Sequence, residues 1–248
     1  MSKQGEIEYA DRIGDAGRAH LRGKPFSDSS CSTLLFSMAA VIGALPRPPA
    51  DVLDCGVGGG WTSRFLARAG YRVVGIDIAP KMIELAEEDR LADGLQNLSF
   101  QVAEYETLAF KEQFDAVLFF DCLHHAADER AAIASAARAL RPGGVLVTHE
   151  PGEGHAKNAT SKDAMAKWDV TEKDLPPNLI ISLGEAAGLR LKRLLPNPVL
   201  VERVAFAPNW IPKSAKEFSA RFFELVAFSR AIFLGERRST AIVVMEKP

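Results

Sequence analysis

Cysteine is scarce in this sequence, which has 248 residues and only three cysteines. They stand far apart, at Cys31, Cys55 and Cys122, and no two have the Cys-x-x-Cys spacing of zinc and redox sites. The sequence therefore predicts neither a cysteine-based metal site nor a disulfide framework. So few cysteines are typical of a reducing compartment, and we expect a cytoplasmic protein.

Long apolar runs are also missing. No stretch of about 18 consecutive apolar residues occurs, which is the length that a membrane-spanning helix needs. Residues 1–12 lack the apolar core of a signal peptide. We therefore expect no membrane span and no secretion by a signal peptide.

An excess of positive charge is absent as well. The chain has 30 Lys and Arg against 32 Asp and Glu, and its formal net charge is −2. Because nucleic-acid-binding proteins usually carry a basic field, nucleic acid is not an expected partner. Hydrophobic residues make up 47% of the chain, which is enough to bury a sizeable core in one or two domains.

Apolar segments alternate with helical patterns in the middle of the chain. We predict helices at 62–69, 80–92 and 128–140, and strands at 51–54, 72–76, 98–102, 114–120 and 145–149. This alternation implies an α/β fold with a doubly wound parallel sheet and helices on both faces. Residues 32–45 form a predicted helix with one buried face, whereas residues 1–31 are polar and are expected to be a loosely ordered lead-in.

The alternation ends after residue 150. Residues 151–175 are expected to be a long polar connection, followed by a helix at 176–187, a strand at 189–195 and a last strand at 240–246. An amphipathic helix at about 214–233 either packs on the core or forms an apolar lid over a substrate pocket. We expect one domain over 1–248, with an amino-terminal cap (1–45), a cofactor-binding core (46–150) and a carboxyl-terminal part with lid and substrate insertions (151–248).

A glycine-rich turn follows the first predicted strand. Glycines at such a turn let a ligand approach the backbone, and the helix behind it points free N–H groups at the ligand. The pattern is Asp-x-Gly-x-Gly-x-Gly, with Asp54, Gly56, Gly58 and Gly60. A dinucleotide site needs a glycine where this chain has Trp61, and an acid at the turn suits a ligand with a cationic end.

A second acid ends the next strand. Asp77 can accept hydrogen bonds from both ribose hydroxyls of a nucleoside that lies across the strand ends. The glycine turn and Asp77 together indicate an adenosine-type ligand, and Asp54 favours S-adenosylmethionine.

With these motifs, residues 51–150 resemble the class I S-adenosylmethionine-dependent methyltransferases that act on small molecules. Asp54 and the three glycines match the first motif of the family, and Leu140 to Gly144 match its Leu-x-Pro-Gly-Gly turn. The resemblance implies a Rossmann-like seven-stranded sheet, mostly parallel with an antiparallel last strand. It also implies S-adenosylmethionine as cofactor and S-adenosylhomocysteine as product.

The same resemblance implies roles for individual residues. Asp54 would face the methionyl ammonium and Asp77 would hold the ribose, while Ile78 would pack on the adenine. The segment after the third strand is similar to the family motif Gly-Asp-Ala-Glu-x-Leu-Pro-Phe, so Glu104 would accept from the adenine amino group, with Tyr105 beside it.

The fourth predicted strand leads into the catalytic candidates. The stretch from Asp121 to His125 resembles the family signature Asp-x-Leu-His-His. Asp121 either holds the cofactor ammonium or is a plain loop acid. His124 and His125 are candidates for the base that takes the proton of the acceptor, or they only orient the loop. Asp121 alone does not supply the Asp and Asn cluster of magnesium-assisted methyltransferases, so no metal site is expected.

We therefore predict an enzyme that transfers a methyl group from S-adenosylmethionine to a small organic acceptor, with oxygen favoured over nitrogen and carbon. Two other interpretations stay open. One is a non-catalytic module that binds S-adenosylmethionine, and the other is an NAD-dependent oxidoreductase on a similar sheet. The identity of the acceptor and the oligomeric state are not encoded in these motifs.

Overall fold

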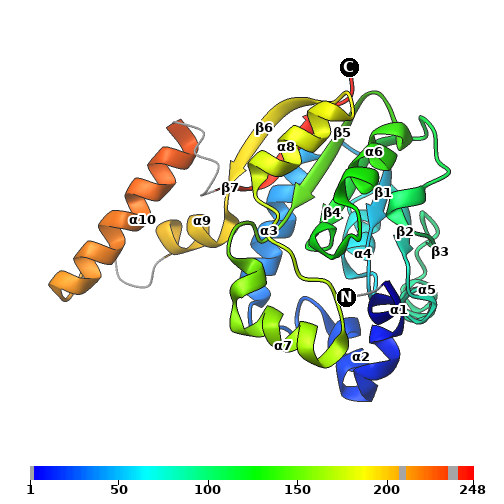
Figure 1. Cartoon of the computed structure of the whole chain (residues 1–248), viewed down its shortest axis with the longest axis horizontal. Helices are drawn as coiled ribbons and strands as arrows, with labels where there is room; N and C mark the ends of the chain where they lie inside the picture. Colours follow the sequence, from blue (N-terminus) through cyan, green and yellow to red (C-terminus); the bar gives the residue numbers. More distant parts are fainter. Residues whose placement is uncertain (1–2, 207–210, 234–239) are drawn as a thin grey trace.

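The computed structural model describes residues 3–206, 211–233 and 240–248 (Figure 1). A single seven-stranded sheet in the order β3-β2-β1-β4-β5-β7-β6 runs through it. Strands β1 to β5 are parallel, and β7 is antiparallel to both β5 and β6. The strands are β1 (Asp51–Cys55), β2 (Arg72–Asp77), β3 (Leu98–Val102), β4 (Phe114–Phe120), β5 (Leu140–His149), β6 (Arg190–Pro196) and β7 (Thr240–Glu246). The predicted mixed seven-stranded α/β fold is confirmed.

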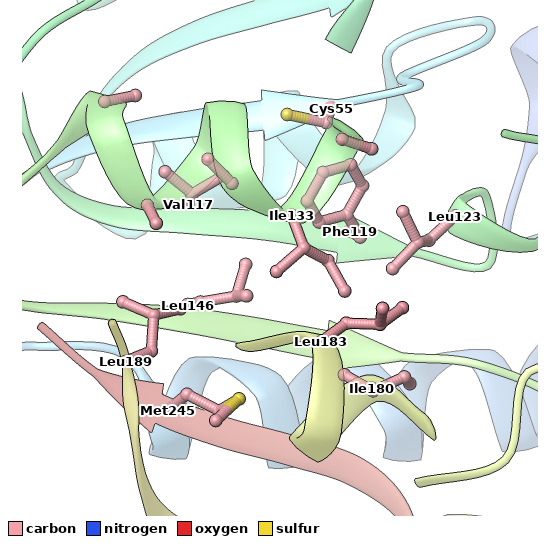
Figure 2. Close-up of a cluster of buried hydrophobic side chains, with 14 of the residues drawn as sticks. Cys55, Val117, Phe119, Leu123, Ile133, Leu146, Ile180, Leu183, Leu189 and Met245 are labelled. Atoms are coloured by element: carbon pink, nitrogen blue, oxygen red, sulfur yellow. The ribbon is translucent and has the colours of Figure 1, made fainter. Parts of the chain in front are cut away.

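Helices cover both faces of this sheet. The core helices are α3 (Cys31–Ala44), α4 (Trp61–Arg68), α5 (Pro80–Ala92), α6 (Glu129–Ala139) and α8 (Pro177–Ala186). Neighbouring residues of one strand point to opposite faces: Val52 of β1 lies in the cluster with Met38 of α3, and Leu53 lies in the cluster with Ile133 of α6. Figure 2 shows the second cluster, in which side chains of α6 and α8 meet those of β4, β5 and β7.

The amino-terminal segment differs from its prediction as a loosely ordered lead-in. It contains two helices, α1 (Lys3–Arg12) and α2 (Gly14–Gly23). Long-range contacts hold them: Arg22 pairs with Glu88 of α5 at 3.0 Å, and the rings of Tyr9 and Trp168 meet edge to face. Because these partners lie far away in the sequence, the local polarity of residues 1–31 did not reveal the helices.

One further local prediction is wrong. The supposed polar connection 151–175 contains the short 3₁₀ turn η3 (His155–Lys157) and helix α7 (Ala159–Trp168), whose first turn is capped by Asn158. The Arg-Pro-Gly-Gly stretch lies within the bounds of β5, but the pairing with β4 skips it: Leu140 pairs with Phe114 and Val145 with Ala116, so the four residues between form an irregularity in the strand. Two more 3₁₀ turns, η1 (Tyr105–Thr107) and η2 (Leu123–His125), follow β3 and β4.

The amphipathic helix at 214–233 is present as α10 (Ala215–Phe233). It packs against β6 and α9 (Pro198–Ala205), to one side of the sheet and away from α1 and α2 (Figure 1). Four of its five phenylalanines are exposed, with 63% of Phe218 and 66% of Phe223 open to solvent, and Phe228 is half-buried. Neither the core-packing nor the lid interpretation describes this placement. Among the described residues, no helix is long and apolar enough to cross a membrane. The division at residues 45 and 150 stays a prediction.

Candidate cofactor and active site

A cavity of about 310 Å³ lies where the parallel strands end. Its walls come from the glycine turn after β1, the ends of β2 and β4, the segment after β3, and helix α1. Ligands of open α/β sheets bind at the carboxyl ends of the strands, beside the point where the strand order reverses. In this sheet the reversal lies between β1 and β4, so the cavity occupies the expected place.

The glycine turn separates into a ligand-facing part and a packing part. Gly56 and Gly58 line the cavity, and a Cβ added at Gly58 would meet no atom within 4 Å. Gly60 has a φ of +76° and is not part of the lining; a Cβ there would lie 2.7 Å from Phe100 and 2.8 Å from Ala86. Gly58 therefore leaves the backbone open to a ligand. Gly56 lines the cavity but also lets Cys122 pack closely, since a Cβ there would lie 2.7 Å from the Cβ of Cys122, and Gly60 lets α4 begin close to β3 and α5.

Asp77 lies in the cavity wall at the tip of β2, with Ile78 next to it. Its carboxylate accepts the N–H of Gly58 and the N–H of Ala79, each at 2.9 Å. Burial raises the pKa of this carboxyl, and the two N–H donors oppose that effect. Each oxygen keeps a free lone pair, so the group is oriented to accept two further hydrogen bonds from a ligand.

Asp54 lies behind the cavity wall and does not line it. Only 1% of its surface is exposed, and its Oδ2 accepts the hydroxyls of Thr62 at 2.7 Å and Ser63 at 2.6 Å. Burial raises the pKa of Asp54 to about 6, although both hydroxyl bonds act in the opposite direction. The acid thus ties the glycine turn to the first turn of α4, and direct contact with a ligand ammonium has no support here.

Asp121 is the acid that follows β4 and faces the cavity. Its φ of +54° is unusual for a residue other than glycine, and its N–H donates to the carbonyl of His149 at 2.7 Å. This strained turn aims an exposed carboxylate at the ligand space. The sequence left two roles open for Asp121, a partner of the cofactor ammonium or a plain loop acid. In the structure its carboxylate lines the cavity, where it could contact a cationic group of a ligand.

Glu104 and Tyr105 also belong to the lining. The carboxylate of Glu104 pairs with Lys3 of α1 at 2.6 Å, and Lys3 lies 3.5 Å from Glu106 as well. The Tyr105 hydroxyl donates to the carbonyl of Cys122 at 3.3 Å, and burial raises the pKa of that hydroxyl. The adenine contacts predicted for these two residues stay predictions.

The two candidate histidines have different surroundings. His124 is 3% exposed and does not line the cavity; its Nδ1 donates to Glu150 at 2.7 Å. Glu150 also accepts the backbone N–H groups of Cys122 and Leu123, at 3.2 and 2.9 Å. Glu150 therefore holds the turn after β4 in shape, and His124 is part of that support.

His125 does line the cavity. Its Nδ1 donates to the carbonyl of Thr171 at 2.5 Å and lies 3.5 Å from Glu6 of α1. Burial lowers the pKa of His125, but the bond and charge of Glu6, the charge of Glu172 and the Thr171 carbonyl outweigh it and raise the pKa to about 9. This favours the protonated ring near neutral pH, in which His125 is a hydrogen-bond donor. Its role as a base stays a prediction.

Two acids of this site were missed by the sequence reasoning. Glu6 accepts the backbone N–H of Thr171 at 2.7 Å, and Glu172 accepts from His155 at 2.5 Å; both acids line the cavity. They lie 166 positions apart, in segments that carry no recognisable motif. Only the folding of α1 and the 169–176 segment against the sheet brings them together.

The strand order, the antiparallel β7 and the cavity at the carboxyl ends of β1, β2 and β4 define the fold of this protein. It is the fold of the class I S-adenosylmethionine-dependent methyltransferases. Residues 53–148 match the family model of a methyltransferase domain.

Curated relatives match the same segment. The ubiquinone biosynthesis O-methyltransferase of Xanthomonas campestris is 40% identical over 101 residues, which are 40% of this chain and 42% of that protein. The demethylmenaquinone methyltransferase of Tropheryma whipplei is 36% identical over 100 residues, or 40% and 41% of the two chains. The chain therefore matches about two fifths of the length of these relatives.

Solved structures resemble the whole chain in fold. Phosphoethanolamine N-methyltransferase 2 of Haemonchus contortus, solved with S-adenosylmethionine, has a TM-score of 0.67 at 19% identity, over 98% of this chain and 60% of that one. A chain from the complex between the Haloferax volcanii Trm112 methyltransferase activator and a methyltransferase has a TM-score of 0.65 at 21% identity, over 98% of both chains.

The residues of the cavity fit the cofactor of this class. S-adenosylmethionine carries a ribose, an adenine and two cationic groups. The lining offers Asp77 and Asp121 as carboxylates, an open glycine backbone and the apolar side chain of Ile78. These groups match the ligand in charge and in hydrogen-bonding capacity.

Proposed function

We propose that this protein transfers the methyl group of S-adenosylmethionine to a hydroxyl oxygen of a small organic acceptor. The observation that carries this proposal is the placement of Asp77, the Gly56–Gly58 turn and Asp121 in one cavity at the carboxyl edge of the sheet. The relatives named as quinone-pathway methyltransferases support a small acceptor, and one of them is named as an O-methyltransferase.

Each part of the cofactor has a proposed partner on this chain. Asp77 accepts hydrogen bonds from the ribose hydroxyls, and Ile78 packs on the adenine. Glu104 accepts a hydrogen bond from the adenine amino group after its ion pair with Lys3 has opened. Asp121, rather than Asp54, faces the ammonium, because Asp121 lines the cavity and Asp54 is bonded to Thr62 and Ser63. Bound S-adenosylmethionine supplies a methyl group on a sulfonium, which is a good leaving group.

The remaining task of the protein is to hold the acceptor in line with that methyl group. Trp61 and Phe120 line the cavity and meet edge to face at 5.3 Å, so they offer apolar walls for a small acceptor. The protonated ring of His125 lies in the same wall. A cation beside a hydroxyl favours its deprotonated form, so His125 is proposed to stabilise the oxygen nucleophile, and His124 to position it.

The test is incubation of the protein with methyl-labelled S-adenosylmethionine and a fractionated metabolite extract, followed by mass spectrometry of labelled products. We expect one family of small molecules to gain label, and an Asp77→Asn variant to transfer far less. Binding of S-adenosylhomocysteine without label in any extract component would favour the non-catalytic module. Binding of NADH and not of S-adenosylhomocysteine would favour the oxidoreductase.

A further inference from the structure

Three of the five histidines of this chain gather at one carboxylate beside the cavity. His124 comes from η2 after β4, His155 from η3, and Glu172 from the segment that follows α7. Nε2 of His124 lies 3.6 Å and Nε2 of His155 lies 2.5 Å from the same oxygen of Glu172. His124, His125 and Glu172 each offer one ligand atom, all within 4.8 Å of one another. We call these four residues the histidine cluster.

The second ring nitrogens of this cluster are already oriented. Nδ1 of His124 donates to Glu150 at 2.7 Å, and Nδ1 of His125 donates to the Thr171 carbonyl at 2.5 Å. Metal-binding histidines show this arrangement, in which a carboxylate or a carbonyl holds one ring nitrogen and leaves the other for the metal. Nε2 of His124, and Nε2 of His125 once the metal displaces its proton to solvent, can therefore serve as ligands in a fixed orientation.

The carboxylates around the histidine rings also favour binding of a cation. Glu172 and Glu150 contact His124, and Glu6 lies 3.5 Å from His125, so three carboxylates surround the imidazoles. The side chains of Glu150 and Glu172 are only 1% and 10% exposed, which makes their negative charge costly without compensation. A divalent ion among neutral imidazoles would balance most of this charge.

The geometry points to a binding site for a divalent transition-metal ion, Zn²⁺ in the first place, formed by His124, His125, His155 and Glu172. Imidazole nitrogens with one carboxylate oxygen are a preferred donor set of Zn²⁺. Tetrahedral zinc with bonds of about 2.0–2.1 Å requires ligand atoms about 3.3 Å apart. The ligand atoms of His124, His125 and Glu172 already lie within 4.8 Å of one another, so these three need only small movements, whereas His155, which contacts Glu172, must turn its ring to become the fourth ligand.

Such an ion would tie together three segments that are separate in the sequence. η3 and the segment after α7 would be fixed to the turn after β4. His125 of that turn and Glu172 of the segment after α7 both line the cavity. Binding of the ion by itself requires no methyl transfer, so the site does not depend on the proposed function.

The sequence could not indicate this site. The ligands lie at positions 124, 125, 155 and 172, and no pair of them has the regular spacing of a known metal motif. The expectation of no metal site came from cysteine spacing and from a missing Asp and Asn cluster, and neither observation concerns histidines that meet through tertiary folding.

The test uses the full chain stripped with EDTA and titrated with ZnCl₂ by calorimetry, and with CoCl₂ by visible absorption. The ligand variants are His155→Gln and Glu172→Gln. The matched controls are His20→Gln, on α2 outside the cluster, and Glu185→Gln, an exposed glutamate on α8. We expect one Zn²⁺ per wild-type chain, an intense Co²⁺ band typical of tetrahedral coordination, and a higher melting temperature with zinc.

Both ligand variants should bind Zn²⁺ at least about 10-fold more weakly and lose the zinc-dependent rise in melting temperature, and both controls should match the wild type. Circular dichroism in EDTA checks that each variant is folded, and if Glu172→Gln does not fold, His155→Gln decides. Absence of stoichiometric zinc binding to the wild type, or equal affinity in the folded ligand variants and the controls, overturns the site. Neither outcome depends on methyl transfer, so this result and that of the labelling experiment are separate.

Discussion

Asp77 is the side chain on which binding of an adenosine-type ligand depends most directly. Two backbone N–H groups hold its carboxylate at the tip of β2, so little conformational entropy is lost when it accepts hydrogen bonds from a ligand. Burial raises its pKa, which makes uncompensated charge there costly and partners valuable. The position of Asp77 at the end of a strand could be predicted from the sequence. The orientation of its carboxylate depends on the glycine turn, whose Gly58 N–H donates to it.

We expect Asp77→Asn to lose about 2 kcal/mol of binding free energy for S-adenosylhomocysteine, which is about a 30-fold weaker Kd, because charge-assisted hydrogen bonds are removed. Isothermal titration calorimetry measures this loss. Asp163→Asn, an exposed position on α7, is the control and should bind as the wild type does. Unchanged affinity of Asp77→Asn would contradict the ribose assignment.

Asp54 provides a test of pH dependence. Its pKa is about 6 in the folded protein and about 3.9 in an unfolded chain, so the folded state binds the proton more tightly. The stability that the protonated Asp54 carboxyl contributes is fully present below the pKa of Asp54 in the unfolded chain. It is lost as the pH rises through the pKa of about 6 in the folded protein. Between pH 4 and pH 7 the free energy of unfolding of the wild type should therefore fall, relative to Asp54→Asn, by an amount on the order of 3 kcal/mol.

Urea unfolding at pH 4, 5, 6 and 7 gives this comparison. Asp163→Asn serves again as control and should follow the wild-type curve, since its carboxylate is exposed. If the curves of the wild type and Asp54→Asn ran parallel over the whole range, Asp54 would not be the buried acid that titrates near pH 6.

At the scale of elements, the turn between β1 and α4 shows how one motif serves two purposes. Gly58 faces the ligand space with no atom near the position of its missing Cβ, whereas Gly60 has atoms of β3 and α5 against that position; Gly56 lines the cavity and also packs against Cys122. All three are one motif in the sequence, and the structure divides them between binding and packing.

Gly60→Ala should lower the free energy of unfolding by about 2–4 kcal/mol, because the new methyl group meets Phe100 and Ala86 and the residue keeps a positive φ. Gly43→Ala is the matched control: Gly43 lies in α3, and a Cβ there meets nothing within 4 Å. That variant should gain about 0.5–1 kcal/mol from higher helix propensity. Urea denaturation measures both, and equal effects would refute the packing role of Gly60.

Helix α1 also acts at this scale, because it closes one side of the cavity through ion pairs and hydrogen bonds. Lys3 reaches Glu104, Glu6 reaches the N–H of Thr171, and Arg12 donates to the carbonyl of Trp168 at 2.9 Å. A polar helix of this kind has no strong apolar periodicity. Its sequence indicates a surface segment, and only its partners show that it belongs to the site.

At the scale of the whole molecule, the two clusters on the faces of the sheet carry the stability, and α10 stands outside both. Ile133 of α6 is fully buried between strands β4 and β5 and helix α8 (Figure 2), whereas Phe222 of α10 is 54% exposed. Exposed area contributes little to folding, since the side chain keeps much of its contact with water.

Ile133→Ala should therefore cost about 2–5 kcal/mol of unfolding free energy, and Phe222→Ala should change it by less than about 0.5 kcal/mol. Chemical denaturation followed by circular dichroism compares the two variants with the wild type. A loss of several kcal/mol in Phe222→Ala would mean that α10 is part of the cooperative core.

Local patterns in the sequence were sufficient to predict the sheet, the glycine turn and the acid at the tip of β2. These features are local: hydrophobic periodicity defines each strand and helix, and the residues from Asp54 to Gly60 form a contiguous turn. The sequence also placed Asp121, His124 and His125 correctly at the end of β4. These predictions succeeded because neighbours in the chain remain neighbours in a strand and its following turn.

Which of these groups reaches the ligand space depends on the packing of distant elements. Asp54 is turned inward to Thr62 and Ser63 while Asp121 is exposed to the cavity, and no local pattern distinguishes the two acids. Glu6 and Glu172 come to the site from segments far apart in the chain. Their burial, charge and hydrogen bonds arise from packing between distant elements, and that packing has no signature in the local order of residues.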